Sequence, residues 1–224
     1  MASKKTTEIS IFGKKPAGSI FLGDMPYSVR LNCKEGGSFV GGSEGQNRRS
    51  NPEQPIDIGI IKVAKYFGSL GKTENVLWLQ LFYVPAPWVD FLPKNTVCVS
   101  YIKKQSIGNL FNKVQEAMDF GDPGMGIFTL KFNKELGTLG NYYSIQFDWR
   151  ERNTDEEKQQ LEAIAGFLTA FSDRLIDLEG TREMIPIDGL SADQINQLNF
   201  APTKLSISEM LEIVHAHRPM LTAS

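Results

Sequence analysis

The sequence predicts a β-rich α+β fold in which a five-stranded, barrel-like core is preceded by extra strands and followed by helices. Three observations support this prediction. Between residues 56 and 149, five runs rich in β-branched and aromatic residues are separated by turn residues. One segment with helical periodicity lies between the third and fourth runs. After residue 150, helix-capping signals replace the strand pattern.

The five strands are expected at residues 56–67, 76–84, 96–102, 127–132 and 142–149. The helix is expected over 106–119, with Ser106 as a possible N-cap. Its apolar residues recur at helical spacing and share one face: Ile107, Leu110, Phe111, Val114 and Met118. The core therefore has the order strand, strand, strand, helix, strand, strand.

The segments on either side of this core have different compositions. Residues 1–55 are predicted to form short strands at 9–12, 18–22, 27–31 and 39–40 and a mobile Gly-rich loop over 36–55. They are expected to be part of the same core. Residues 150–224 read as an acidic helical extension. It has a capping box at 154–157, a helix that should dock on the barrel, and two short helices near 191–198 and 206–217.

Charge is distributed unevenly along the chain. Residues 1–150 carry 18 Lys and Arg against 13 Asp and Glu, a balance of +5; residues 151–224 carry 6 against 13, a balance of −7, and the sum is −2. A basic body attracts phosphate, and an acidic end can compete with phosphate or recruit a basic partner. Chance segregation would give the same numbers, so charge alone leaves both interpretations open.

The candidate motifs for catalysis and metal binding do not have the residue spacing that these functions require. The Gly68–Thr73 segment ends like a phosphate loop, but Tyr66 stands where the first glycine is required, so a hairpin turn is expected. His215 and His217 are two apart on an expected helix and cannot share a metal. Cys33 and Cys98 are read as buried thiols. The sequence thus predicts no enzyme activity, no cofactor and no metal site.

No apolar run has the length of a signal peptide or a membrane span, so a cytoplasmic protein without a membrane partner is expected.

The strand and helix order over 56–149, less than half of the chain, resembles that of OB-fold single-stranded DNA-binding proteins. The resemblance rests on this order and not on a residue signature. It implies a ligand face on the second and third strands and on loops 68–75 and 133–141.

Single-strand binding combines aromatic rings, on which bases stack, with Lys and Arg, which follow the phosphates. The stacking candidates are Trp78, Phe82, Trp88, Tyr101 and Tyr142. The phosphate-binding candidates are Lys62, Lys72, Lys103, Lys104, Arg48 and Arg49. Trp78 and Phe82 lie in a nearly continuous apolar strand, so each could equally belong to the core.

The function expected from these residues is sequence-tolerant binding of single-stranded nucleic acid. The hypothesis is that this nucleic acid is DNA, and RNA is the alternative. The alternative function is that of a non-catalytic assembly module. Such a module would form a homo-oligomer through the apolar loop 85–93, or recruit a protein partner through the acidic C-terminal region.

Overall fold

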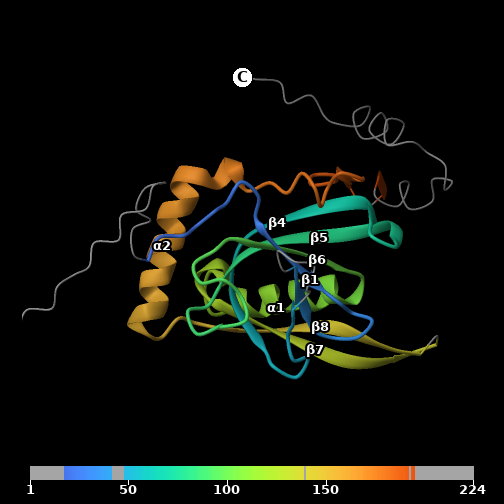
Figure 1. Ribbon diagram of the computed structural model, residues 1–224, viewed down its shortest axis with the longest axis horizontal. Helices are drawn as coiled ribbons and strands as arrows, with labels where there is room; N and C mark the ends of the chain where they lie inside the picture. Colours follow the sequence, from blue (N-terminus) through green and yellow to red (C-terminus); the bar gives the residue numbers. More distant parts are fainter. Residues whose placement is uncertain (1–17, 42–47, 139, 192, 195–224) are drawn as a thin grey trace, which may run out of the picture.

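The computed structural model describes residues 18–41, 48–138, 140–191 and 193–194, which form a curled, mixed β-sheet with two α-helices (Figure 1). The strands are β1 (Tyr27–Leu31), β2 (Ser38–Val40), β3 (Arg48–Arg49), β4 (Ile56–Leu70), β5 (Thr73–Pro85), β6 (Cys98–Lys103), β7 (Ile127–Gly137), β8 (Gly140–Arg150) and β9 (Met184–Pro186). The α-helices are α1 (Gln105–Met118) and α2 (Asp155–Phe171), and two short 3-10 helices are η1 (Pro123–Met125) and η2 (Ser172–Arg174). The predicted β-rich α+β class is observed.

Within the described residues the sheet has the order β3-β2-β1-β6-β5-β4-β7-β8, with β9 added to β4. The long strand β4 pairs with β5 along most of its length. Its opposite edge pairs first with β7, at 56–58, and later with β9, at 66–68. A register shift between Ile60 and Lys62 separates these two parts. Because strands twist and irregularities bend them, β4 changes neighbours here and the sheet curls.

The curl encloses the main hydrophobic core. Alternate residues of β4 and β5 point into it, and α1 closes it from one end with Ile107 and Leu110. Val29 of β1 and Val40 of β2 lie in the same cluster, so the N-terminal strands share this core. The largest fully buried side chains of the cluster are Tyr83, Ile58, Leu79, Leu81, Ile102, Leu110, Leu130 and Ile145.

The N-terminal chain lies between β6 and β8. Strand β1 runs parallel to β6, with Tyr27 opposite Cys98. Its other edge pairs with β2, and in the turn after β1 the carbonyl of Cys33 accepts from the backbone N–H of Tyr143 in β8, at 2.7 Å. Further along β8, α1 makes the contact, because Ser106 Oγ accepts from Ile145 N at 3.0 Å. The turn after β1 and the start of α1 thus both contact β8.

A second hydrophobic cluster covers the outer face of the sheet. Ile164 and Phe167 of α2 pack against Phe82 and Val84 of β5. The predicted capping box begins this helix, with the Thr154 side chain accepting from the Glu157 backbone and the Glu157 side chain accepting from the Thr154 backbone. Residues 172–191, called the C-terminal segment below, follow α2, add β9 to the sheet and bury Leu175 against it. The predicted docking of α2 on the sheet is therefore observed.

Several local predictions differ from the structure. Arg48 and Arg49, expected in a mobile loop, form β3 because they pair with Val40 and Phe39. The strand expected at 18–22 is reduced to one bridge between Phe21 and Thr96. Strand β9 was not predicted. The predicted capping signal at 191–194 is present, but the rest of that helix, the helix at 206–217 and the strand at 9–12 lie outside the described residues.

Candidate nucleic-acid interface

The β4–β5 hairpin, the start of α1 and the β7–β8 hairpin meet at one end of the sheet. Lys103 Nζ donates to Thr73 Oγ1 of the first hairpin at 2.7 Å. Gln105 Nε2 donates to Glu135 Oε1 of the second hairpin at 3.4 Å, and Gln105 Oε1 accepts from the Tyr142 hydroxyl at 2.8 Å. This region is called the hairpin mouth, and it comprises Lys72, Thr73, Lys103, Lys104, Gln105, Glu135 and Tyr142.

A tight turn from β6 into α1 presents the two neighbouring lysines of the mouth. Lys104 has a φ of 52°, in the left-handed region, and this reverses the chain direction before the helix starts. Its side chain is exposed, whereas that of Lys103 is half-buried over the Trp78 ring, 5.0 Å from the centroid. The structure therefore places Lys103, Lys104 and Tyr142 around Gln105, and Lys72 in the turn beside Thr73.

The electrostatics of the mouth favour an anion. Burial, and then the nearby charge of Lys104, lower the pKa of Lys103 below its usual value. Both causes penalise the ammonium form, and a negatively charged ligand beside the two lysines would offset them. Tyr142 is 38% exposed and offers part of its ring at the same place. A phosphate and an adjacent base could therefore be held together here.

Two predicted stacking residues are not accessible. Phe82 is 0% exposed and Trp78 is 6% exposed. The prediction that the outer face of β5 and β6 stays open is wrong, because α2 and the C-terminal segment cover it. The Trp78 ring is also held by its indole N–H, which donates to the Gly68 carbonyl at 3.2 Å. Neither ring can take a base in this structure.

Tyr101 and Lys62 contact the C-terminal segment that covers this face of the sheet. The Tyr101 hydroxyl donates to Asp177 Oδ2 at 3.0 Å. Lys62 Nζ donates to the Leu175 carbonyl at 2.8 Å and lies 5.7 Å from the centroid of the Phe82 ring. Both predicted binding residues therefore hold the C-terminal segment on the sheet, and their contacts are separate from those of the hairpin mouth.

Trp88 belongs to another cluster. It is 42% exposed, its indole N–H donates to Asp57 Oδ2 at 2.9 Å, and the Arg150 guanidinium lies 5.5 Å from its ring centroid. Arg150 also pairs with Glu157 at 2.7 Å, at the start of α2. The predicted Trp88 is thus accessible, but its contacts are with the β4 and α2 region and not with the hairpin mouth.

Arg48 and Arg49 lie against phenylalanines that were not among the predicted site residues. The Arg48 guanidinium is 5.6 Å from the centroid of Phe91, and its Nη2 donates to the Phe91 carbonyl at 3.1 Å. The Arg49 guanidinium is 5.4 Å from the centroid of Phe39. Arg30, also missed, lies 4.9 Å from the same ring. The signal for Arg30 was its place in the strand expected at 27–31, next to the buried Val29.

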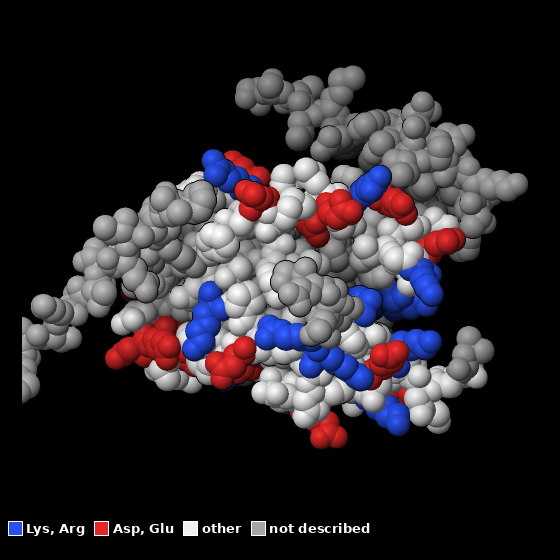
Figure 2. All heavy atoms as spheres, in the orientation of Figure 1, with Lys and Arg blue, Asp and Glu red and all other residues white. Residues whose placement is uncertain are grey.

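Figure 2 shows how charge is distributed on one face of the molecule. Lys and Arg side chains form a band across the middle of this face and reach the notch between the two hairpins on the right. Asp and Glu side chains are more frequent along the upper border, where the C-terminal segment runs in Figure 1. Asp and Glu side chains also gather at the lower left and lie beside the band, so both signs of charge occur on this face.

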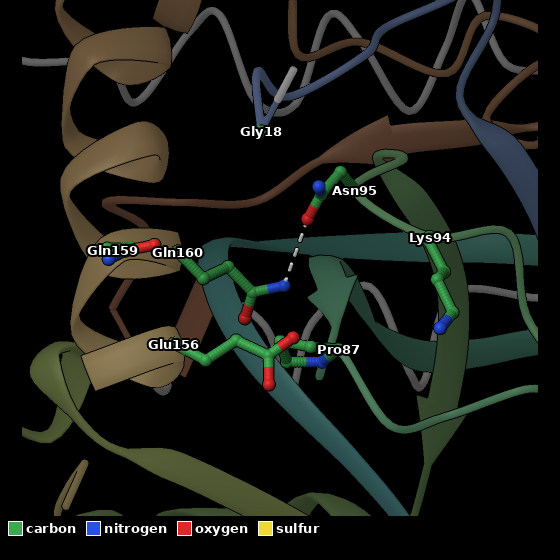
Figure 3. Close-up of a pocket in the computed structure, with 7 residues that line it drawn as sticks. All are labelled: Gly18, Pro87, Lys94, Asn95, Glu156, Gln159 and Gln160. Atoms are coloured by element: carbon green, nitrogen blue, oxygen red, sulfur yellow. Dashed lines mark hydrogen bonds between the residues drawn. The ribbon is translucent and has the colours of Figure 1, made fainter. Parts of the chain in front are cut away.

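A small pocket of about 210 Å³ lies between α2 and the chain after β5 (Figure 3). At its back, Gln160 Nε2 donates to Asn95 Oδ1 at 3.3 Å and to the Pro85 carbonyl at 2.9 Å. The pocket is smaller than the roughly 300 Å³ at which small-molecule sites begin, and its amides already bond to one another. Its lining residues are Gly18, Pro87, Lys94, Asn95, Glu156, Gln159 and Gln160.

Within the described part of the chain, no group of three or more His, Cys, Asp and Glu side chains could hold a metal ion. None of the helices described is long and apolar enough to cross a membrane. Comparisons of the chain with protein-family models, with curated proteins and with solved structures gave no match. Function is therefore inferred from the geometry and charge of the hairpin mouth and its surroundings.

Proposed function

We propose that this protein binds single-stranded nucleic acid, with DNA as the expected strand and with little sequence preference. The hairpin mouth is the proposed site. The observation that carries the proposal is a pair of contacts between the elements that form the mouth. Lys103 bonds to Thr73, next to Lys72, and Gln105, next to Lys104, bonds to Tyr142, which is 38% exposed. Lysines would follow the phosphates and the ring would stack on a base.

The connectivity supports an OB-type assignment. Strands β4, β5 and β6 form an antiparallel meander, a helix follows, and the β7–β8 hairpin returns to pair with β4. OB barrels bind ligands with the loops that correspond here to the two hairpins. The outer strand face would contribute less than in an open barrel, because the C-terminal segment covers it.

Fluorescence anisotropy with a labelled oligothymidine, titrated over a range of salt concentrations, tests the proposal. The wild-type protein should bind at low salt, and its affinity should fall as salt rises. The double variant Lys103→Gln/Lys104→Gln should bind more weakly. Its slope of log K against log salt should be smaller by about 0.7 for each phosphate that the variant no longer neutralises.

The matched control is Lys158→Gln, which removes one exposed lysine from the acidic helix α2. It should bind as the wild type does. Absence of oligonucleotide binding at low salt would overturn the proposal, as would equal affinity of the double variant and the control. Competition by unlabelled RNA of the same length would assign the strand type.

A second candidate function, protein assembly, is favoured by one observation. Phe120 is 73% exposed and stacks on Trp149, and Met118 and Met125 nearby in the chain are 65% and 54% exposed. The predicted contact loop 85–93 offers less, since Val89 and Leu92 are buried and Trp88 is its main exposed ring. Light scattering should give an oligomer that Phe120→Ser dissociates if assembly is the function; a monomer at all concentrations would exclude it.

A further inference from the structure

The outer face of the three-stranded ribbon β1–β2–β3 carries a row of two arginines and one phenylalanine. The strand register places Arg30 opposite Phe39, and Phe39 opposite Arg49. Side chains alternate across a strand, so the neighbours Val29 and Val40 point inward and are buried. The row therefore faces outward, with Phe39 half-buried at its centre and exposed arginines on both sides.

The two arginines of the row differ in the hydrogen bonds of their guanidinium groups. Arg49 is held in place, because its Nη2 donates to the carbonyls of Glu35 and Gly36 at 2.6 and 2.8 Å. The Arg30 side chain lies over the Phe39 ring, and forms no hydrogen bond or ion pair with the residues that the structure describes. Ring contact restricts the Arg30 guanidinium while its donors remain available. A planar fork held this way is suited to a phosphate or to the face of a base.

The row is connected to the hairpin mouth by the turn between β1 and β2. In this turn the Cys33 carbonyl accepts from the Tyr143 backbone, next to Tyr142 of the mouth. Gly36 lies against the Tyr143 ring, where a β-carbon would come within 3.0 Å. The same turn supplies the two carbonyls that hold Arg49. One strand of nucleic acid could therefore pass from the mouth over this turn to the row.

We propose that the row Arg30–Phe39–Arg49 is a second contact segment for the same single strand, beyond the hairpin mouth. Arg30 would bind a phosphate through its side-chain donors, and a base would stack on the guanidinium plane that the Phe39 ring supports. The nature of the ligand rests on the proposed function; the existence of a second segment rests on the row itself. A surface cation–π contact without a ligand is the competing explanation.

The length dependence of binding separates these explanations. Oligothymidines of about 4 to about 16 nucleotides span the site sizes of one OB barrel. Arg30→Gln should bind the shortest strands as the wild type does, since they fill the mouth alone. With strands long enough to reach the row, the slope of log K against log salt for Arg30→Gln should be smaller in magnitude than that of the wild type by about 0.7. Phe39→Leu removes the ring that restrains the Arg30 guanidinium, so it should weaken the binding of long strands by about 2- to 5-fold, the range expected for one exposed cation–π contact.

Two controls complete the design. Arg30→Lys keeps the charge but not the fork, so it should retain the salt slope and lose part of the affinity for long strands. Lys103→Gln/Lys104→Gln should weaken the binding of strands of every length. If the short strands bind and Arg30→Gln matches the wild type at all lengths, the inference fails while the proposed function stands. If no strand binds at any length, the proposed function fails and the inference with it.

Discussion

The hydroxyl of Tyr101 in β6 joins the sheet to the C-terminal segment, since it donates to Asp177 Oδ2 at 3.0 Å and accepts from Gln80 Nε2 at 2.6 Å. Asp177 is 8% exposed and Gln80 is 1% exposed, so this polar bridge is buried. Further along the segment, Lys65 N donates to Asp188 Oδ2 at 3.0 Å. These bonds make the segment part of the fold and not a loosely attached cover.

Tyr101→Phe is expected to destabilise the protein by about 1–3 kcal/mol, because it leaves the buried Asp177 and Gln80 side chains without their shared partner. Urea denaturation measures this change. The control Tyr142→Phe removes an exposed hydroxyl and should change the free energy of unfolding by less than about 0.5 kcal/mol. Should Tyr101→Phe weaken oligothymidine binding at unchanged stability, the buried bridge described here would not be its main role.

Phe82→Ala and Tyr142→Ala should have opposite profiles. Phe82 is fully buried between β5 and α2, so its truncation should cost about 3–5 kcal/mol in unfolding free energy. Tyr142 lies in the hairpin mouth with 38% of its surface exposed, so its truncation should weaken oligonucleotide binding with little loss of stability. Thermal unfolding and anisotropy on both variants check this. Equal binding losses per folded molecule would place both rings at the ligand.

The sequence was sufficient for the elements whose signals are local. The helical spacing of Ile107 and Leu110 predicted both ends of α1 within one residue, and the capping box at Thr154 and Glu157 predicted the start of α2. The lysines at 103 and 104 were found because they end a strand before a helix. Each of these signals depends on neighbours a few residues apart, and no long-range contact is needed to read them.

The accessibility of the site could not be predicted, because it depends on contacts between distant segments. The sequence allowed Phe82 to be either a stacking residue or a core residue, and it is buried by Ile164 and Phe167, which lie more than eighty residues further along the chain. Strand β9 has three residues and no periodic pattern to reveal it. The pairing of Arg30 with Phe39 required the register of β1 and β2, which the sequence does not specify.

Gly59 shows the same dependence on a distant partner. It lies in β4 just before the register shift between Ile60 and Lys62, and it makes room for the buried guanidinium of Arg152. A β-carbon at Gly59 would lie 2.6 Å from Arg152 Nη2. Gly59→Ala should therefore displace the guanidinium from its bonds to the Met125 and Glu157 carbonyls. The expected loss of unfolding free energy is about 1–3 kcal/mol, measured by urea denaturation.

The matched control for Gly59→Ala is Gly108→Ala. Gly108 lies within α1 with open space where a β-carbon would be placed, so alanine should raise stability by about 0.5–1 kcal/mol through its helix propensity. The two variants make the same chemical change with opposite expected signs. A neutral Gly59→Ala would mean that Arg152 moves aside without cost.

Glu157 should dominate the acid sensitivity of the fold. Its carboxylate accepts from Arg150 Nη2 at 2.7 Å and from the backbone N–H groups of Asn153 and Thr154, and these bonds lower its pKa from 4.5 to about 2. A lowered pKa in the folded state means that its stabilisation is fully present above about pH 4.5 and is lost as pH falls toward about 2. Glu157→Gln should lower the free energy of unfolding near pH 7 by about 1–3 kcal/mol.

Urea denaturation repeated between pH 7 and pH 2 tests this prediction. The wild-type curve should fall most steeply below about pH 4.5, and the Glu157→Gln curve should be flatter over the same interval, because glutamine has no proton to take up. Glu162→Gln, an exposed carboxylate in the middle of α2, is the control and should follow the wild type. Parallel curves for the wild type and Glu157→Gln would show that the acid-sensitive group lies elsewhere. The helix cap would then contribute to stability without linking it to pH.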